Sequence, residues 1–140
     1  MGDAQLRAIV CHKHPSSGRL TFLQFASGNI CGPLVLPRLS VISDLPQAKV
    51  VFHPSIAVRQ VAEHLQLPEQ WLMLMQDFKL FLEVPKQYAS GGLLPVFLVM
   101  VVGRDLPNVP YGHSWIELPD GFSLPYLERE ILREAYRHVM

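Results

Sequence analysis

One stretch of this chain shows a helical repeat clear enough to define a buried face. Across residues 53–67, HPSIAVRQVAEHLQL, apolar side chains recur at i, i+3, i+4 and i+7, which aligns them along one side of an α-helix. These residues are Val58, Val61, Ala62 and Leu65. Pro54 suits the first turn, with His53 or Ser55 as the cap, and Pro68 opposes continuation past residue 67. We therefore expect an amphipathic helix that packs on a core.

The remaining patterns predict strands on both sides of this helix and a second helix at the end. Residues 5–11 and 19–25 are typical of a hairpin, since the intervening HPSSG contains Gly18, which can adopt a positive φ. Apolar groups on both faces of 19–25 indicate a central strand. Further strands are predicted within the second half of 71–84, at 93–102 and at 114–118, with polar or proline-rich loops at 87–92 and 104–112. From Pro125 onward, apolar residues with helical spacing predict the closing helix, and these are Leu127, Ile131, Ala135 and Val139.

The glycine- and proline-rich segment 26–47 favours irregular backbone, with one short strand proposed at 33–36. The 140 residues, 49% of them hydrophobic, suit a single soluble domain. Twelve basic residues balance twelve acidic ones, so the composition gives no specific signal for nucleic acid. The apolar run 93–102 is far short of the roughly 20 residues that cross a membrane. Two cysteines without a disulfide framework, and no targeting signal in MGDAQL, predict a cytoplasmic location.

The predicted helix resembles the second half of a Nudix box, G-x5-E-x7-R-E-U-x-E-E-x-G-U, in which U is aliphatic. Four positions of RQVAEHLQL match, and they are Arg59, Val61, Glu63 and Leu67. Three depart from the box: Gln60 and His64 stand where it has Glu, and Gln66 stands where it has Gly. The upstream half is missing, since Val51 and Leu45 fall at its Glu and Gly positions. The order of the other landmarks, including Leu36–Pro37 and Trp115, is also similar to that family.

The resemblance implies an α/β fold, a Nudix-like α/β/α sandwich with a mixed sheet covering residues 1–140. In that family the box carboxylates hold Mg²⁺ or Mn²⁺ against a diphosphate linkage, because hard cations require several oxygen ligands. Here Glu63 is the one box carboxylate that remains, so it is the candidate metal ligand. The candidate ligand-binding residues are Arg59, Gln60, Glu63, His64 and Arg38.

These observations predict a degenerate Nudix-like domain that binds a nucleotide, a nucleoside diphosphate derivative or a protein partner without efficient hydrolysis. No cofactor is firmly implied, although Mg²⁺ or Mn²⁺ would be required for hydrolysis. One alternative is a divergent Nudix pyrophosphohydrolase whose metal site is rebuilt by other carboxylates, for which the candidates are Glu69, Asp77, Glu83, Glu117 and Asp120. Another is a structural interaction module, such as a homodimer.

Other constellations favour structural interpretations. Cys11, His12 and His14 resemble zinc ligands, but consecutive strand residues point to opposite faces. The histidines His53, His64 and His113 could meet in a cluster, although separate surface or loop positions are the preferred interpretation.

A further set of patterns concerns packing and surface pairs. Ser114 lacks the nucleophile-elbow context of a serine hydrolase. Glu130 and Arg133 are within reach on one helix face, as are Arg59 and Glu63. Core packing is expected for at least two of three apolar residues that could instead form a contact surface, and these are Trp71, Met73 and Met75.

Overall fold

The sheet is organised around β6 (Leu93–Val101), the most apolar run of the chain. One edge of β6 pairs in parallel with β1 (Ala8–Lys13). Its other edge pairs antiparallel with β5 (Leu80–Glu83) over the first half and with β4 (Leu72–Leu74) over the second. The computed structural model describes residues 7–34, 36–37, 39–43, 54–88, 92–117 and 123–140. Within them, the predicted buried strand is confirmed.

The sheet has the order β3-β5-β6-β1-β2-β7, with β4 beside β6. It is mixed, because β1 and β6 run parallel whereas the other pairs are antiparallel. The predicted hairpin joins β1 to β2 (Leu20–Gln24), and Gly18 in its turn has a φ of 72°. As predicted, β2 is not an edge strand, since β7 (Ser114–Ile116) pairs with its other side.

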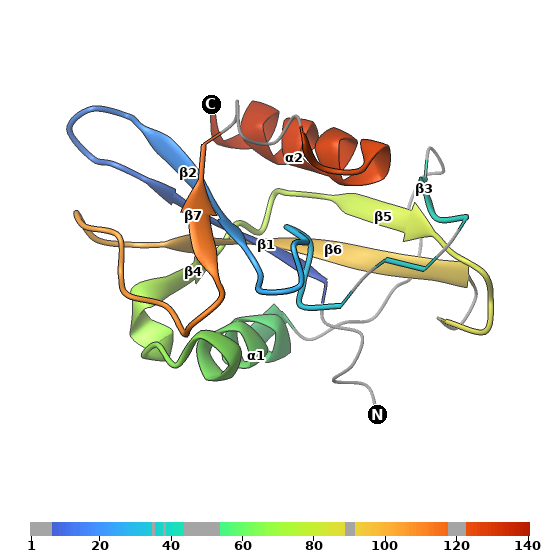
Figure 1. Ribbon diagram of the computed structural model, residues 1–140, viewed down its shortest axis with the longest axis horizontal. Coiled ribbons are helices and arrows are strands. Elements are labelled where there is room, and N and C mark those ends of the chain that lie inside the picture. Colours follow the sequence, from blue (N-terminus) through green and yellow to red (C-terminus); the bar gives the residue numbers. More distant parts are fainter. Residues whose placement is uncertain (1–6, 35, 38, 44–53, 89–91, 118–122) are drawn as a thin grey trace.

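The two helices cover opposite faces of the sheet, with α2 (Tyr126–Val139) on one side and α1 (Pro54–Leu65) on the other (Figure 1). The alternation of side chains along β1 explains this arrangement. Ala8 and Val10 belong to the core beneath α1, whereas Ile9 and Cys11 belong to the core beneath α2. The helices contribute their predicted apolar residues to these two cores, and the fully buried ones are Val61, Leu65, Ile131 and Ala135. The α/β/α sandwich is therefore confirmed.

Some sequence-based expectations are wrong in detail. Val58 is only partly buried, because it lies at the margin of the α1 core. The strand proposed at 33–36 is not formed by its described residues, since Pro33 and Leu34 are in bends and Leu36 is irregular. The next strand along the chain is instead β3 (Val41–Ile42). Helix α1 ends at Leu65, two residues before the predicted limit.

The expected packing of Trp71 and Met73 is also contradicted. Trp71 ends the short 3-10 helix η2 (Glu69–Trp71), and its exposed fraction is 45%. Met73 is 46% exposed on β4, a three-residue strand that sequence reasoning missed. Successive side chains of a strand point to opposite faces, so Met73 faces outward between Leu72, which is buried, and Leu74, which is partly buried. Met75 alone of the three packs against the core.

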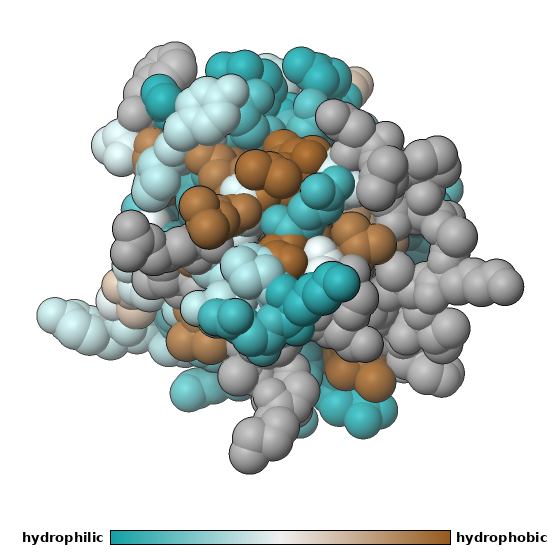
Figure 2. Space-filling model, turned by 90° about the vertical axis from the view of Figure 1, so that its right-hand side faces the viewer, coloured by the Kyte–Doolittle hydropathy of each residue, from teal (hydrophilic) through white to brown (hydrophobic). Residues whose placement is uncertain are grey.

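Apolar groups also reach the surface at the β3 and β5 end of the sheet, where Figure 2 shows brown side chains among polar ones. The exposed residues of this kind include Leu39 and Val41.

Both cysteines are free and buried, and burial raises the pKa of the Cys11 thiol to about 12. Within the described ranges, no helix is long and apolar enough to cross a membrane.

Candidate functional site

The outer side of α1 carries the box-like residues. Since Val61, Ala62 and Leu65 face the sheet, the neighbouring residues of the helix are directed outward: Arg59, Glu63 and His64 are exposed, and Gln60 is partly exposed. The helix closes with Gln66 in the left-handed region at a φ of 57°. The Leu67 N–H then donates to the Ala62 carbonyl at 3.0 Å, a capping arrangement that favours glycine. Gln66 occupies the position at which the Nudix box has Gly.

Beyond this helix end, three rings from distant parts of the chain meet. His64 lies 5.2 Å from His113 and 5.5 Å from Phe25, measured between ring centroids. Phe25 and His113 are 5.7 Å apart and perpendicular. Phe25 follows β2, and His113 immediately precedes β7, so the β2–β7 pairing brings these two rings together. We call His64, His113 and Phe25 the ring cluster.

The backbone of the 26–29 turn fixes the orientation of His113. The Ala26 N–H donates to His113 Nδ1 at 2.9 Å. Neutral His113 therefore carries its proton on Nε2, where it can donate to a ligand. Burial lowers the pKa of His113 below its ordinary value, and the nearby His64 lowers it further. Both effects favour this neutral form.

Gly112 allows the 26–29 turn to approach His113 closely. Its φ is 94°, and a Cβ built on it would lie 3.0 Å from the Ala26 Cβ. A larger residue would be strained at that φ and would press on the turn that holds His113. Phe25, in turn, is only 2% exposed and forms a rigid base for both imidazoles.

The described residues do not assemble a metal site of the Nudix type. Among the residues that the structure describes, no three His, Cys, Asp or Glu side chains are close enough to hold an ion. Glu63 remains on α1, but the carboxylates proposed to rebuild a site are dispersed: Glu69 is in η2, Glu83 is in β5, and Glu117 pairs with Arg19. By the same criterion, Cys11, His12 and His14 do not form a zinc site with one another or with other described residues.

Among the described residues, Arg59 and Glu63 do not form an ion pair. The predicted pair of Glu130 with Arg133 is present, with 3.1 Å between its charged groups, and Glu134 also pairs with Arg137. Arg38, His53 and Asp120 lie outside the described residues. His64 and His113 meet, so the preferred interpretation of separate surface histidines is wrong for these two.

A buried polar network beneath α2 was not predicted from the sequence. Glu128 is 3% exposed, and its Oε1 accepts the Ile30 N–H at 2.6 Å. Arg7, equally buried, donates from Nη1 to the carbonyl of Cys31 at 3.3 Å. Burial raises the pKa of Glu128, although the Ile30 N–H and the charge of Arg7 act in the opposite direction. This network anchors the irregular segment after β2 to α2; the only signal in the sequence is a charged residue within an otherwise apolar helix face.

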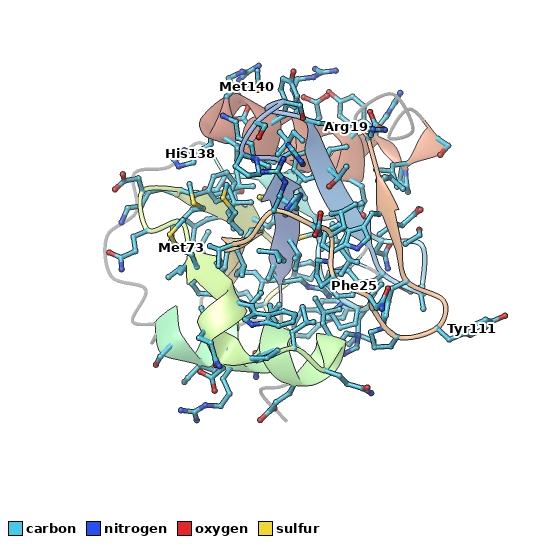
Figure 3. The ribbon with its side chains drawn as sticks, turned by 90° about the vertical axis from the view of Figure 1, so that its left-hand side faces the viewer. Arg19, Phe25, Met73, Tyr111, His138 and Met140 are labelled. Carbon is cyan, nitrogen blue, oxygen red and sulfur yellow. The ribbon has the colours of Figure 1, made fainter. Side chains whose placement is uncertain are left out.

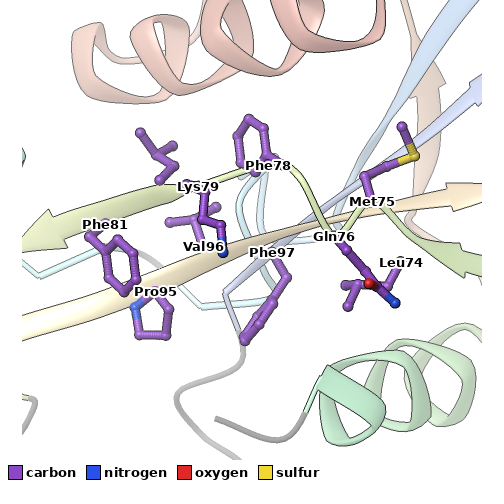
Figure 4. A pocket seen from close by; sticks show the side chains of 10 residues that line it. Leu74, Met75, Gln76, Phe78, Lys79, Phe81, Pro95, Val96 and Phe97 are labelled. Atoms are coloured by element: carbon purple, nitrogen blue, oxygen red, sulfur yellow. The ribbon is translucent and has the colours of Figure 1, made fainter. Parts of the chain in front are cut away.

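A hollow of about 170 Å³ lies in the notch where β4 and β5 both approach β6 (Figure 4). Its walls are mainly apolar, including Phe81, Pro95 and Phe97. Gln76 and Lys79 are the polar residues among those that line it. It therefore offers less hydrogen-bonding chemistry than the outer side of α1.

Comparisons with known proteins identify the fold. No family model and no curated protein matches the sequence. Solved structures do match, and two of them are a crystal structure of Caenorhabditis elegans Ap4A hydrolase, with a TM-score of 0.60, 17% identity and coverage of 96% of each chain, and a binary complex of C. elegans Ap4A hydrolase, with a TM-score of 0.55, 14% identity and coverage of 95% of this chain and 96% of that one. This likeness over the whole length shows a Nudix-like fold.

Proposed function

We propose that this Nudix-like domain binds a nucleotide or nucleoside diphosphate derivative beside the outer side of α1, without efficient hydrolysis. The ring cluster is the observation that carries the proposal. At the position where the box has its second consecutive Glu, His64 contributes a ring that contacts His113 and Phe25. The exposed ring of His64 and the partly exposed ring of His113 suit a planar, anionic ligand better than they suit two hard cations.

The charges near the cluster support the same proposal. His113 can donate from Nε2, as its Nδ1 is already occupied by the Ala26 N–H. Arg59 is exposed on the same helix and can donate several hydrogen bonds to a phosphate. Glu63 is one carboxylate, whereas the binding of Mg²⁺ or Mn²⁺ usually involves several oxygen ligands. The Ap4A hydrolases that share the fold make a dinucleoside polyphosphate a reasonable first ligand to test.

The decisive experiment measures binding and turnover on the same samples. Ap4A, ADP-ribose, nucleotide sugars and nucleoside triphosphates are titrated by calorimetry, and released phosphate or nucleoside monophosphate is assayed with Mg²⁺ or Mn²⁺. We expect binding by at least one compound and negligible release. His113→Ala should weaken binding by roughly tenfold, the value of one lost hydrogen bond to a charged group. Glu134→Gln, a change on the remote helix α2, is the matched control and should leave binding unchanged.

Two outcomes would overturn this proposal. Robust turnover that disappears in Glu63→Gln would identify a divergent metal-dependent hydrolase. Absence of both binding and turnover would favour the interaction module, for which a concentration-dependent dimer is the prediction to test by sedimentation.

A further inference from the structure

A cavity of about 350 Å³ opens at the hairpin end of the sheet, away from the ring cluster. Its floor is the paired His12 and Thr21 of β1 and β2, and the segment after β6 forms one wall through Arg104 and Leu106. Figure 3 looks onto this end of the molecule, with the labelled Arg19 beside the hairpin and Phe25 at the other end of β2. The lining residues Trp115, on β7, and Glu117, just after it, lie two and four residues beyond His113, which is about 7 and 13 Å at roughly 3.3 Å per strand residue. The residues that line the cavity do not include those of the ring cluster.

Hydrogen-bond donors converge on this cavity. His14 accepts the N–H groups of Ser16 and Ser17 on Nδ1, at 3.2 and 3.1 Å. Its Nε2 therefore carries the proton of the neutral ring and is available to donate. Arg104 is exposed at the wall and has a full set of guanidinium donors. Thr21 is 7% exposed, and its hydroxyl has no hydrogen-bond partner among the described residues.

Two carboxylates also line the cavity, and they limit its positive potential. Glu117 is bound to Arg19 in an ion pair, so it holds that guanidinium in place and leaves some of its N–H groups free to bind elsewhere. Asp105 is exposed next to Arg104. The formal charges of the two arginines and two carboxylates cancel. Binding here must therefore rely on directed hydrogen-bond donors and not on net positive charge. The donors of the two arginines and His14 outnumber the carboxylate oxygens that are not already paired with Arg19.

An apolar wall completes the cavity. Trp115 is partly buried, and its indole N–H already donates to the Pro107 carbonyl at 3.1 Å. Its ring can therefore offer only an apolar surface to a ligand, alongside Leu106. The volume is at the lower end of the range for small-molecule sites, about 300 to 1,000 Å³, and suits one ring with one charged group.

We propose that this cavity is a second binding site, which takes a small phosphate monoester that carries a planar ring. The phosphate lies against Arg104, Arg19 and His14, and the ring lies against Trp115. Phosphate oxygens accept several donors at once, and guanidinium groups match their geometry. This site does not depend on the function proposed for the outer side of α1.

The test uses phenyl phosphate, with phenol as the uncharged ring control, in nuclear magnetic resonance titrations of the ¹⁵N-labelled chain. Trp71→Phe identifies the indole signal of Trp115. We expect phenyl phosphate to shift this signal and the Gly103 amide while leaving the His113 amide in place. Phenol at the same concentration should produce much smaller shifts.

Arg104→Gln should weaken the binding of phenyl phosphate by about fivefold, a typical effect for one exposed charge. Arg133→Gln, on the remote face of α2, is the matched control and should bind as the unchanged chain does. Because Arg104 is exposed, its substitution leaves the fold intact, which the spectrum verifies. Equal shifts with phenol, unchanged binding by Arg104→Gln, or shifts confined to His113 would each overturn the second site.

Discussion

Replacement of Gln66 by glycine should stabilise the protein. Gln66 follows α1 with a φ of 57°, a conformation that costs a residue with a Cβ about 1–2 kcal/mol. Glycine avoids this cost but loses about 0.5–1 kcal/mol more through its greater freedom in the unfolded chain. The Gln66 side chain is exposed, so its removal sacrifices little packing. The net gain should be about 0.5–1 kcal/mol in the free energy of unfolding.

That gain converts into a measurable rise in melting temperature. With an unfolding entropy of about 2.1 cal/mol/K per residue, a chain of this length loses about 0.3 kcal/mol of stability per degree near its midpoint, so the rise should be about 2–3 °C. Calorimetry and urea unfolding measure the temperature and the free energy independently.

Two control variants separate the backbone effect from other causes. Gln66→Ala keeps the left-handed strain and should change stability by less than about 0.5 kcal/mol. Arg59→Gly places glycine in the exposed, right-handed interior of the same helix, where it should cost about 1 kcal/mol. If Gln66→Gly destabilised the protein as much as Arg59→Gly does, the assignment of a strained helix end would be refuted.

Four further predictions concern the cores, the buried carboxylate and the ring cluster. Leu65→Ala should destabilise by about 2–5 kcal/mol in urea unfolding, because Leu65 is 1% exposed beneath α1; a loss below 1 kcal/mol would contradict its packing. The raised pKa of Glu128 means that the folded state favours the protonated acid, so this group's contribution to stability is complete below its unfolded pKa and is lost as pH rises through the folded one; urea unfolding from pH 4 upward should show this decline, and Glu128→Gln should remove it. Gly112→Ala should cost about 1–3 kcal/mol and weaken ligand binding at His113, with Gly18→Ala, in the β1–β2 hairpin turn and with open space around its Cβ position, as a control for binding. Cys11 should resist thiol reagents at neutral pH until the chain is unfolded, since burial raises its pKa to about 12; rapid labelling of the native protein would contradict this.

The sequence predicts the main elements well because they are long and periodic, and the resemblance to the Nudix family implied their arrangement as a sandwich. Residues 93–102 and the two helical stripes each contain enough apolar positions to define a buried side. The short strands were harder to predict. Val41–Ile42 and Leu72–Leu74 become strands only because β5 and β6 offer them a partner, and so short a segment carries little intrinsic signal.

The site depended even more on contacts between distant residues. The box pattern singled out His64, but its contact with His113 requires the packing of α1 on the sheet together with the pairing of β2 with β7, which places His113 beside Phe25. No local spacing encodes that pairing. Similarly, a glutamate in the first turn of a helix is ordinarily a residue that favours helix initiation. Only the folded chain brings the Ile30 N–H to the carboxylate of Glu128. Periodicity reports which side of an element is buried, whereas the partner on that side depends on topology.

The parallel pairing of β1 with β6 determines when this molecule can fold. Ala8 pairs with Phe97, and Phe22 of the adjacent strand pairs with Ile116, so the centre of the sheet joins the two ends of the chain. During synthesis the first hairpin emerges long before its partners, with apolar groups on both of its faces. Closing so large a loop costs entropy before any core forms, which slows folding. A nascent chain that ends before β6 therefore leaves β1 without its central neighbour, and its exposed apolar strands are the form of this protein most prone to aggregate or to be captured by a chaperone.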